Sequence, residues 1–454
     1  MTANQELKIR WEWEAAAQAR APEHRATWAR IEIMAGPDFV TLAEDRESGS
    51  SRRSIYCPLY PLAEWIAYNW WFLQADTRPS SFLSQDLGVV AQASPTLPRA
   101  MQDHHSIRAS GDGFAWPNLV IVPDGPETRL VWQSDRARSS NWPIRFLTHG
   151  DCRVGSELVQ HEFELVVTET LTRLSEQGVT GTVLENEWAA IQQTGREEAE
   201  YCRAAARLGL DPYADAEPYE QDIMQVGETL SGEVLTDFLN AVNPQHIGRA
   251  LTWVSSGRSV IERRPAAREA LRPSESNAPE AGLLQELRAK RRELVSALGA
   301  PWDVGYQQAR AIRRQIAPDA TARLAVDRYV LSRSRQAPDA SLQALGASAD
   351  QLQPLVIVGQ RRPVTSNRFT LSRALWHCIW DDSPLFIVTT AHTHRQRVER
   401  AFAAELLAPA DGIAALLESP PEAASQEELE QIAQRFGVSS MVIEHQVRNH
   451  LIAA

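Results

Sequence analysis

The chain has 454 residues, of which 43% are hydrophobic and 23% are charged, and its formal net charge is -12. This composition is typical of a globular protein, and the length exceeds one ordinary core, so we expect two or three domains. The negative charge argues against nucleic-acid binding over the whole surface, because neutralising phosphates requires a cationic surface.

The cysteines and the apolar runs indicate the compartment. Four cysteines are scattered without a C-x-x-C pair, which fits a reducing compartment and gives neither a disulfide framework nor a thiolate zinc site. No apolar run approaches the ~20 residues of a membrane helix, and the first residues do not resemble a secretory signal. We therefore expect a cytoplasmic protein with no membrane partner.

Residues 1–150 are predicted to form a β-rich domain of unknown role, which holds nine of the 14 tryptophans. LKIRWEWEA alternates apolar and charged residues, as a strand with one solvated face does. Similar segments that end at turn residues are ARIEIMAG, NLVIVPDG, TRLVWQS and PIRFLTHG. YPLAEWIAYNWWFLQAD has helical spacing of apolar residues. We expect this helix to pack on a sheet, with the tryptophans in the core rather than on a ligand platform.

Residues 151–325 are predicted to form a helical region. GSELVQHEFELVVTETLTRLSEQG is amphipathic and ends at a glycine stop signal. Helical spacing recurs in EWAAIQQTGREEAEYCRAAARLGL, SGEVLTDFLNAV and WDVGYQQARAIRRQI.

Residues 326–454 are predicted to form a compact C-terminal unit. Two apolar strands, LVIVG and LFIVTT, alternate with two helices, RFTLSRALWH and RQRVERAFAAELLAP. A final helical pair, EELEQIAQRFGVSSMVIEHQVRNHLI, is similar to a helix-turn-helix, with Gly437 at the turn and Ser439 capping the second helix. DNA reading by that helix would rely on four polar side chains, namely Glu444, His445, Gln446 and Arg448. In so acidic a chain we do not expect DNA as the partner.

The sequence RFTLSRALWH is close to the pattern of a zinc-protease helix. In the H-E-x-x-H motif two histidines on one helical face bind Zn²⁺, and the glutamate polarises the attacking water. Here Arg373 and Ala374 stand at the first two positions, and only His377 remains. Arginine cannot coordinate a cation and alanine accepts no proton, so we assign no catalytic residue.

The strings RFTLSRALWH, RAFAAELLAP and FGVSSMVIEHQV resemble the ImmA/IrrE-type metallopeptidases, whose members carry RFTLAHELGH and ANxFAAELLMP. PWDVGYQQARAIRRQI is similar to the lead-in helix of that family, so the resemblance covers roughly residues 300–452. It implies a zincin-like α+β domain over residues 326–454. The predicted fold is therefore α+β, with a β-rich N-terminal domain, a helical middle region and this ImmA/IrrE-like C-terminal domain.

The resemblance places the acidic third ligand of the family at Gln396 and its asparagine at Arg400. With Arg373, these residues are our candidates for binding in the cleft. Residues 361–400 hold seven arginines against three acids, which favours an acidic peptide, and we expect it to pair along the strand LVIVG. A buried arginine needs a partner, so we expect Asp381, Asp382 or Glu405 to form a salt bridge with Arg373 in place of the metal.

A second hypothesis gathers the histidines into a new site. His392 and His394 precede the RQRVERAFAAELLAP helix, and with His377 they would give three imidazole ligands for zinc. If the Arg373 salt bridge replaces the metal instead, no cofactor is expected.

Three functions follow from these patterns. The leading one is a non-catalytic relative of the ImmA/IrrE-type peptidases, a regulatory or interaction protein that engages a protein or peptide partner. By resemblance that partner is a repressor-like regulator in a stress response or in mobile-element control. The alternatives are an active zinc endopeptidase with the three-histidine site and a DNA-binding regulator that uses the C-terminal helices.

Overall fold

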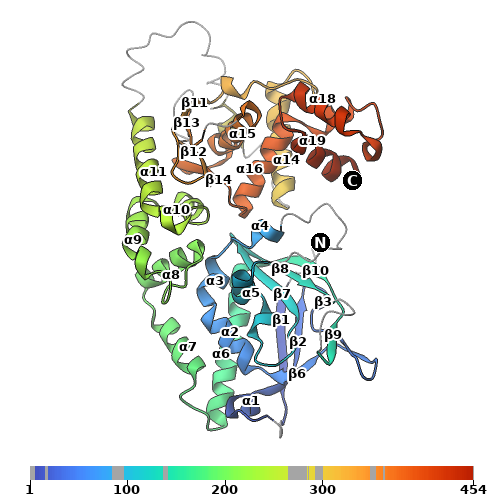
Figure 1. Cartoon of the computed structure of the whole chain (residues 1–454), viewed down its shortest axis with the longest axis vertical. Coiled ribbons are helices and arrows are strands. Elements are labelled where there is room, and N and C mark those ends of the chain that lie inside the picture. The colour runs from blue at the N-terminus through green and yellow to red at the C-terminus, as the bar shows by residue number, and fades with distance from the viewer. Residues whose placement is uncertain are drawn as a thin grey trace. The chain divides into compact units, whose positions relative to one another are not determined.

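The computed structural model describes residues 6–15, 19–83, 97–135, 142–263, 284, 286–291, 300–347, 354–360 and 363–452. The chain forms two compact units, and the boundary between them follows Glu217. Both combine helices with small sheets, and the predicted α+β class is confirmed (Figure 1). The helices of residues 151–325 belong to both units. Within the described ranges, every helix is too short or too polar to cross a bilayer.

The first unit contains three antiparallel sheets, whose strand orders are β1-β2-β3 with β6 on β2, β10-β8-β7, and β5-β4-β9. Buried and solvated positions alternate along β2, which places its apolar side chains on one face. The five strands predicted from the sequence are all present. The strands are β1 (Leu7–Trp13), β2 (Trp28–Ala35), β3 (Asp38–Phe39), β4 (Ala43–Asp45), β5 (Ser51–Arg52), β6 (Ile55–Pro58), β7 (Asn118–Asp124), β8 (Glu127–Gln133), β9 (Ile144–Phe146) and β10 (Gly150–Gly155).

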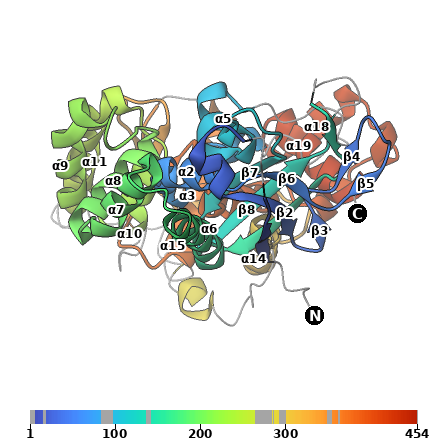
Figure 2. The same ribbon diagram turned by 90° about the horizontal axis from the view of Figure 1, so that it is seen from below.

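Helices of the first unit pack beside these sheets, as Figure 2 shows for α2, α3 and α6. The predicted helix over residues 60–76 is two helices that meet at Asn69, whose side chain donates to the Trp65 carbonyl. Five of the nine N-terminal tryptophans are buried, in line with a structural core. The helices are α1 (Pro22–Ala26), α2 (Tyr60–Tyr68), α3 (Trp70–Ala75), α4 (Ser80–Leu83), α5 (Arg99–His105), α6 (Ser156–Glu176), α7 (Val183–Gln193) and α8 (Arg196–Leu208).

The second unit has a four-stranded mixed sheet in the order β11-β13-β12-β14. Strand β13 (Leu355–Val358) is parallel to β11 (Leu331–Ser334) and antiparallel to β12 (Leu342–Ala347). Both edges of β13 are thus paired, and the prediction that a peptide adds along LVIVG is wrong. The outer strands are β11 and β14 (Leu385–Thr389).

The helices of the second unit cover this sheet (Figure 1). Helix α14 (Pro301–Ile316) packs along α16 (His394–Leu407), and α16 packs on α15 (Val364–Trp380). Helix α10 (Gly232–Leu239) packs on β14. The other helices are α9 (Glu220–Thr229), α11 (Ile247–Glu262), α17 (Ala410–Ala414), α18 (Gln426–Phe436) and α19 (Ser440–Gln446).

Candidate functional site

Helix α15 places Arg373 and His377 one turn apart in the interior of the second unit. Residues 370–379 of this helix are all buried, so its middle is enclosed by the rest of the unit on every side. Arg373 is 1% exposed and His377 is fully buried. A buried cation is costly unless other groups compensate its charge, so the partners of Arg373 determine what this site can do.

The partner of Arg373 is Glu399 on α16. The Arg373 Nε atom donates to Glu399 Oε1 over 3.0 Å, and Nη2 donates to the same oxygen. Nη1 donates to Gln343 Oε1 over 2.8 Å, and Nη2 also donates to the Thr389 carbonyl over 2.6 Å. The guanidinium is held at three points by charged and polar acceptors.

The predicted salt bridge exists, but the predicted partners were wrong. Asp382 pairs with Arg291, and Glu405 binds Arg310 and Gln446. Asp381 contacts His377 instead. Glu399 was missed because the resemblance drew attention to Gln396, although a carboxylate one turn further along the same helix was a visible alternative.

His377 binds a carboxylate at each ring nitrogen. Its Nε2 lies 2.5 Å from Glu399 Oε2, and its Nδ1 lies 3.0 Å from Asp381 Oδ2. Burial disfavours the charged imidazole, but Glu399 and Asp381 outweigh it and raise the pKa of His377. Arg395 Nη2 also lies 3.0 Å from Nδ1, so each ring nitrogen already faces a polar partner from this chain.

Glu399 is the centre of the network. Burial disfavours its charged form, but Arg373 and His377 prevail and lower the pKa of Glu399 to about 2. One carboxylate oxygen accepts from Arg373 and the other from His377. Glu399 is therefore ionised at neutral pH and fully engaged.

Gln396 and Asp237 connect this network to α10. Gln396 is fully buried, and its Nε2 donates to Asp237 Oδ1. Arg395, the preceding residue, lies 3.5 Å from Asp237 Oδ2 and 3.4 Å from Glu233 Oε2. Burial raises the pKa of Asp237 to about 7, although Arg395 opposes the shift. Nothing in the sequence pointed to Asp237, which is 159 residues from Gln396.

The remaining predicted site residues lie around the start of α16. His394 begins the helix, and His392 lies in the loop before it. Arg400 lies one turn beyond Gln396 and donates to the Thr389 carbonyl over 3.3 Å. Among the described residues, no group of three or more His, Cys, Asp or Glu side chains is placed to hold a metal ion. The three-histidine zinc site stays a prediction.

The zinc of the resembling family does not fit the residues present here. A guanidinium occupies the first ligand position and binds Glu399, the acid nearest to His377. Ala374 is fully buried at the position of the general base. Arg373, His377 and Glu399 bind one another at the positions where the metal would need ligands, so we derive no step that uses a metal.

The C-terminal helices have the predicted turn. Gly437 has a left-handed φ of +69°, and Ser439 is the N-cap of α19. Gln446, a predicted DNA-reading residue, is 1% exposed and donates to Glu405 Oε2 over 2.7 Å and to the Ala408 carbonyl over 3.0 Å. That side chain is used for packing against the rest of the unit.

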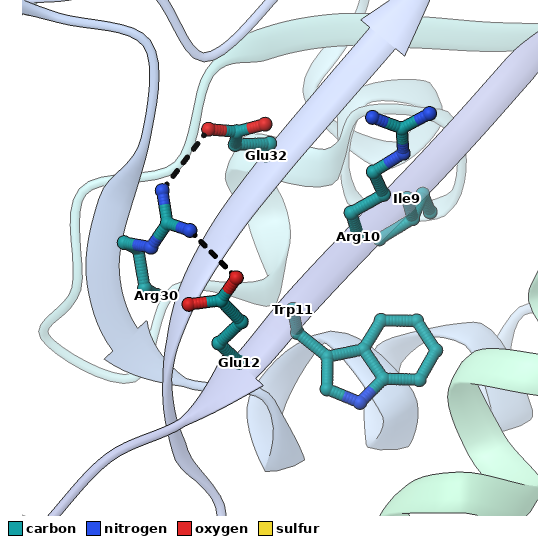
Figure 3. Close-up of a pocket in the computed structure, with 6 residues that line it drawn as sticks. All are labelled: Ile9, Arg10, Trp11, Glu12, Arg30 and Glu32. Carbon is teal, nitrogen blue, oxygen red and sulfur yellow. Dashed lines mark hydrogen bonds and ion pairs between the residues drawn. The ribbon is translucent and has the colours of Figure 1, made fainter.

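The first unit carries a separate open pocket on β1 and β2 (Figure 3). Arg30 on β2 lies 2.8 Å from Glu12 on β1 and 3.3 Å from Glu32 on its own strand, so these charges pair with one another. Arg10 and Trp11 also line the pocket. Such cross-strand ion pairs are common on solvated sheets, and this pocket carries no functional assignment.

Comparison with known proteins identifies part of the second unit. Residues 334–448 match the family model Peptidase_M78, described as an IrrE N-terminal-like domain. The match confirms the resemblance to the ImmA/IrrE-type family for the C-terminal region. Comparison with curated proteins and with solved structures found no match. Helices α10 and α14 lie outside the matched residues.

Proposed function

We propose that the IrrE N-terminal-like domain of this chain is a non-catalytic module that binds a protein partner in a regulatory circuit. The observation that carries the proposal is the buried ion pair between Arg373 and Glu399. This pair fills the position where the resembling peptidases hold their metal. By that resemblance, the partner is a repressor-like protein in a stress response or in mobile-element control.

Peptidase chemistry requires an activated water and a group that accepts its proton. Arg373 cannot hold the metal that would activate the water. Ala374 cannot accept the proton, and Glu399 is committed to Arg373 and His377. Removing Arg373 from Glu399 would leave an uncompensated charge in the interior, at a cost of about 3–5 kcal/mol. The network therefore favours retention of the fold without turnover.

An extended partner segment would bind at the outer strand β11. In the described part of the chain, β11 pairs only with β13, and Ser332, Arg333 and Ser334 are exposed. Main-chain groups on such an edge accept an added strand regardless of its sequence. The exposed edge of β11 supports binding of the partner there rather than along the interior strand β13.

Elemental mass spectrometry of the purified full chain, with His377→Ala as a comparison, tests the proposal. We expect both proteins to contain far less than about one zinc per chain, the content of a catalytic zinc site. The same samples, supplemented with zinc, should not cleave an unfolded protein substrate. Stoichiometric zinc that is lost in His377→Ala, or cleavage that requires His377, would overturn the proposal.

A further inference from the structure

The polar cluster around Arg373 also contains Arg400 on α16, which donates to the same Thr389 carbonyl as Arg373. Glu399 uses one oxygen for Arg373 and the other for His377. Arg400, the next residue on α16, has no carboxylate within ion-pair distance among the described residues. It donates only to two main-chain carbonyls, that of Gln396 over 3.5 Å and that of Thr389 over 3.3 Å. The charge of Arg400 is therefore not compensated by a direct ion pair.

This lack of compensation matters because Arg400 is partly buried. Burial, together with the neighbouring Arg373, lowers the pKa of Arg400 to about 9. Two long hydrogen bonds to neutral oxygens recover little of the lost hydration. Arg400 remains a cation at neutral pH, and an anion next to it would gain an interaction that water screens only weakly.

His392 adds a second polar group at the same place. Its Nδ1 atom is buried and has no hydrogen-bond partner. Arg373 and Arg400 both donate to the Thr389 carbonyl, and His392 follows Thr389 by three residues in the loop before α16. The side chain of His392 is only half-buried, so the position is reachable from solvent. An unpaired buried nitrogen next to an uncompensated guanidinium indicates a missing partner.

The preceding turn of α16 shows which partner suits this helix. There, Gln396 donates to the Asp237 carboxylate of α10. Arg395 lies within 3.5 Å of the carboxylates of Asp237 and Glu233. The preceding turn therefore pairs its polar groups with carboxylates of α10. On the next turn Glu399 binds Arg373 and His377, and Arg400 has no direct ion pair among the described residues.

We propose that Arg400 and His392 form a subsite for a carboxylate side chain of an acidic peptide. The inference rests on the proposed partner-binding function and adds to it the chemistry of the bound segment. Arg400 supplies the charge and a forked donor, which matches the two oxygens of a carboxylate. His392, in the loop before α16, supplies its unpaired Nδ1 atom as a second hydrogen-bonding group.

Calorimetry on the full chain with two capped peptides tests the subsite. One peptide carries four glutamates, and its control carries glutamines at the same positions. We expect the glutamate peptide to bind wild type at least about ten-fold more tightly than the glutamine peptide, as loss of a charge-assisted hydrogen bond implies. Arg400→Gln should remove that difference, and His392→Ala should reduce it.

Arg258→Gln is the matched control, because Arg258 lies on α11 of the same unit in an exposed pair with Glu262. Arg400→Lys keeps the charge and should retain part of the preference for the glutamate peptide. This variant separates loss of the charge from any loss of stability in Arg400→Gln. Equal affinity of wild type for both peptides, no binding of the glutamate peptide, or equal loss in Arg400→Gln and Arg258→Gln would overturn the subsite. Competition by inorganic phosphate without any glutamate preference would also overturn it. Zinc content is measured separately, so failure of the subsite and failure of the proposed function are distinguishable.

Discussion

The guanidinium of Arg373 and the carboxylate of Glu399 form an ion pair that is almost completely shielded from solvent. Glu399→Gln removes the carboxylate that binds Arg373 and leaves a buried cation. We therefore expect the free energy of unfolding of the second unit to fall by about 3–5 kcal/mol. Denaturant titration measures this change. Arg373→Met combined with Glu399→Gln removes both charges and should recover most of the loss. A double variant as unstable as Glu399→Gln alone would contradict a charge-pair role.

The raised pKa of Asp237 predicts that the stability of the fold depends on pH. Its pKa is about 7 in the folded chain, whereas the unfolded chain ionises it near about 4. Between these values the folded protein holds a proton that the unfolded chain has lost, so this group lowers stability as the pH rises from about 4 to 7.

Asp237→Asn keeps the oxygen that accepts from Gln396 and removes the ionisation. We expect the thermal midpoint of wild type to fall relative to that of Asp237→Asn between pH 4 and pH 7, and the difference to level off above pH 7. Parallel midpoints over this range would show that Asp237 titrates normally.

Zinc binding is predicted to return when the first two motif positions are restored. His377 Nε2 and Glu399 Oε2 are hydrogen-bonded over 2.5 Å, so a small separation of the two side chains would let both bind one ion once the guanidinium is removed. Arg373→His with Ala374→Glu would supply a third ligand and a base, and we expect about one zinc per chain in this variant. Adding His377→Ala should abolish the zinc. A restored motif that binds no zinc would show that the surrounding cations prevent coordination.

Gly305 is predicted to control the contact between α14 and α16. A Cβ atom at this position would meet the Val398 carbonyl oxygen and would lie 2.8 Å from Ala401 Cβ. Gly305→Ala should therefore destabilise the second unit by about 1–3 kcal/mol through overpacking. Gly227 in α9 has open space at its Cβ position, so Gly227→Ala should be neutral or stabilising by up to about 1 kcal/mol. Similar changes for the two variants, measured by denaturant titration, would contradict a tight helix contact.

The sequence predicted local structure better than long-range pairing. Alternation identified β1 and β2, and the spacing of WDVGYQQARAIRRQI identified α14, which begins one residue earlier, at Pro301. Periodicity reports which face of an element is apolar, but it does not report which carboxylate meets a given arginine. The pairing of Arg373 with Glu399 depends on how α15 and α16 pack, and LVIVG became an interior strand because β11 and β12 flank it.

The contact between Asp237 and Gln396 also sets where the chain can be cut for study. A fragment restricted to the matched residues 334–448 would lose α10, and with it the carboxylate that binds Gln396. It would also lose the main-chain N–H of Asn243, which donates to the Asp339 carboxylate, and the Trp253 indole, which donates to the Arg335 carbonyl. Expression trials should therefore begin the shortest fragment near Pro218, at the start of the second unit.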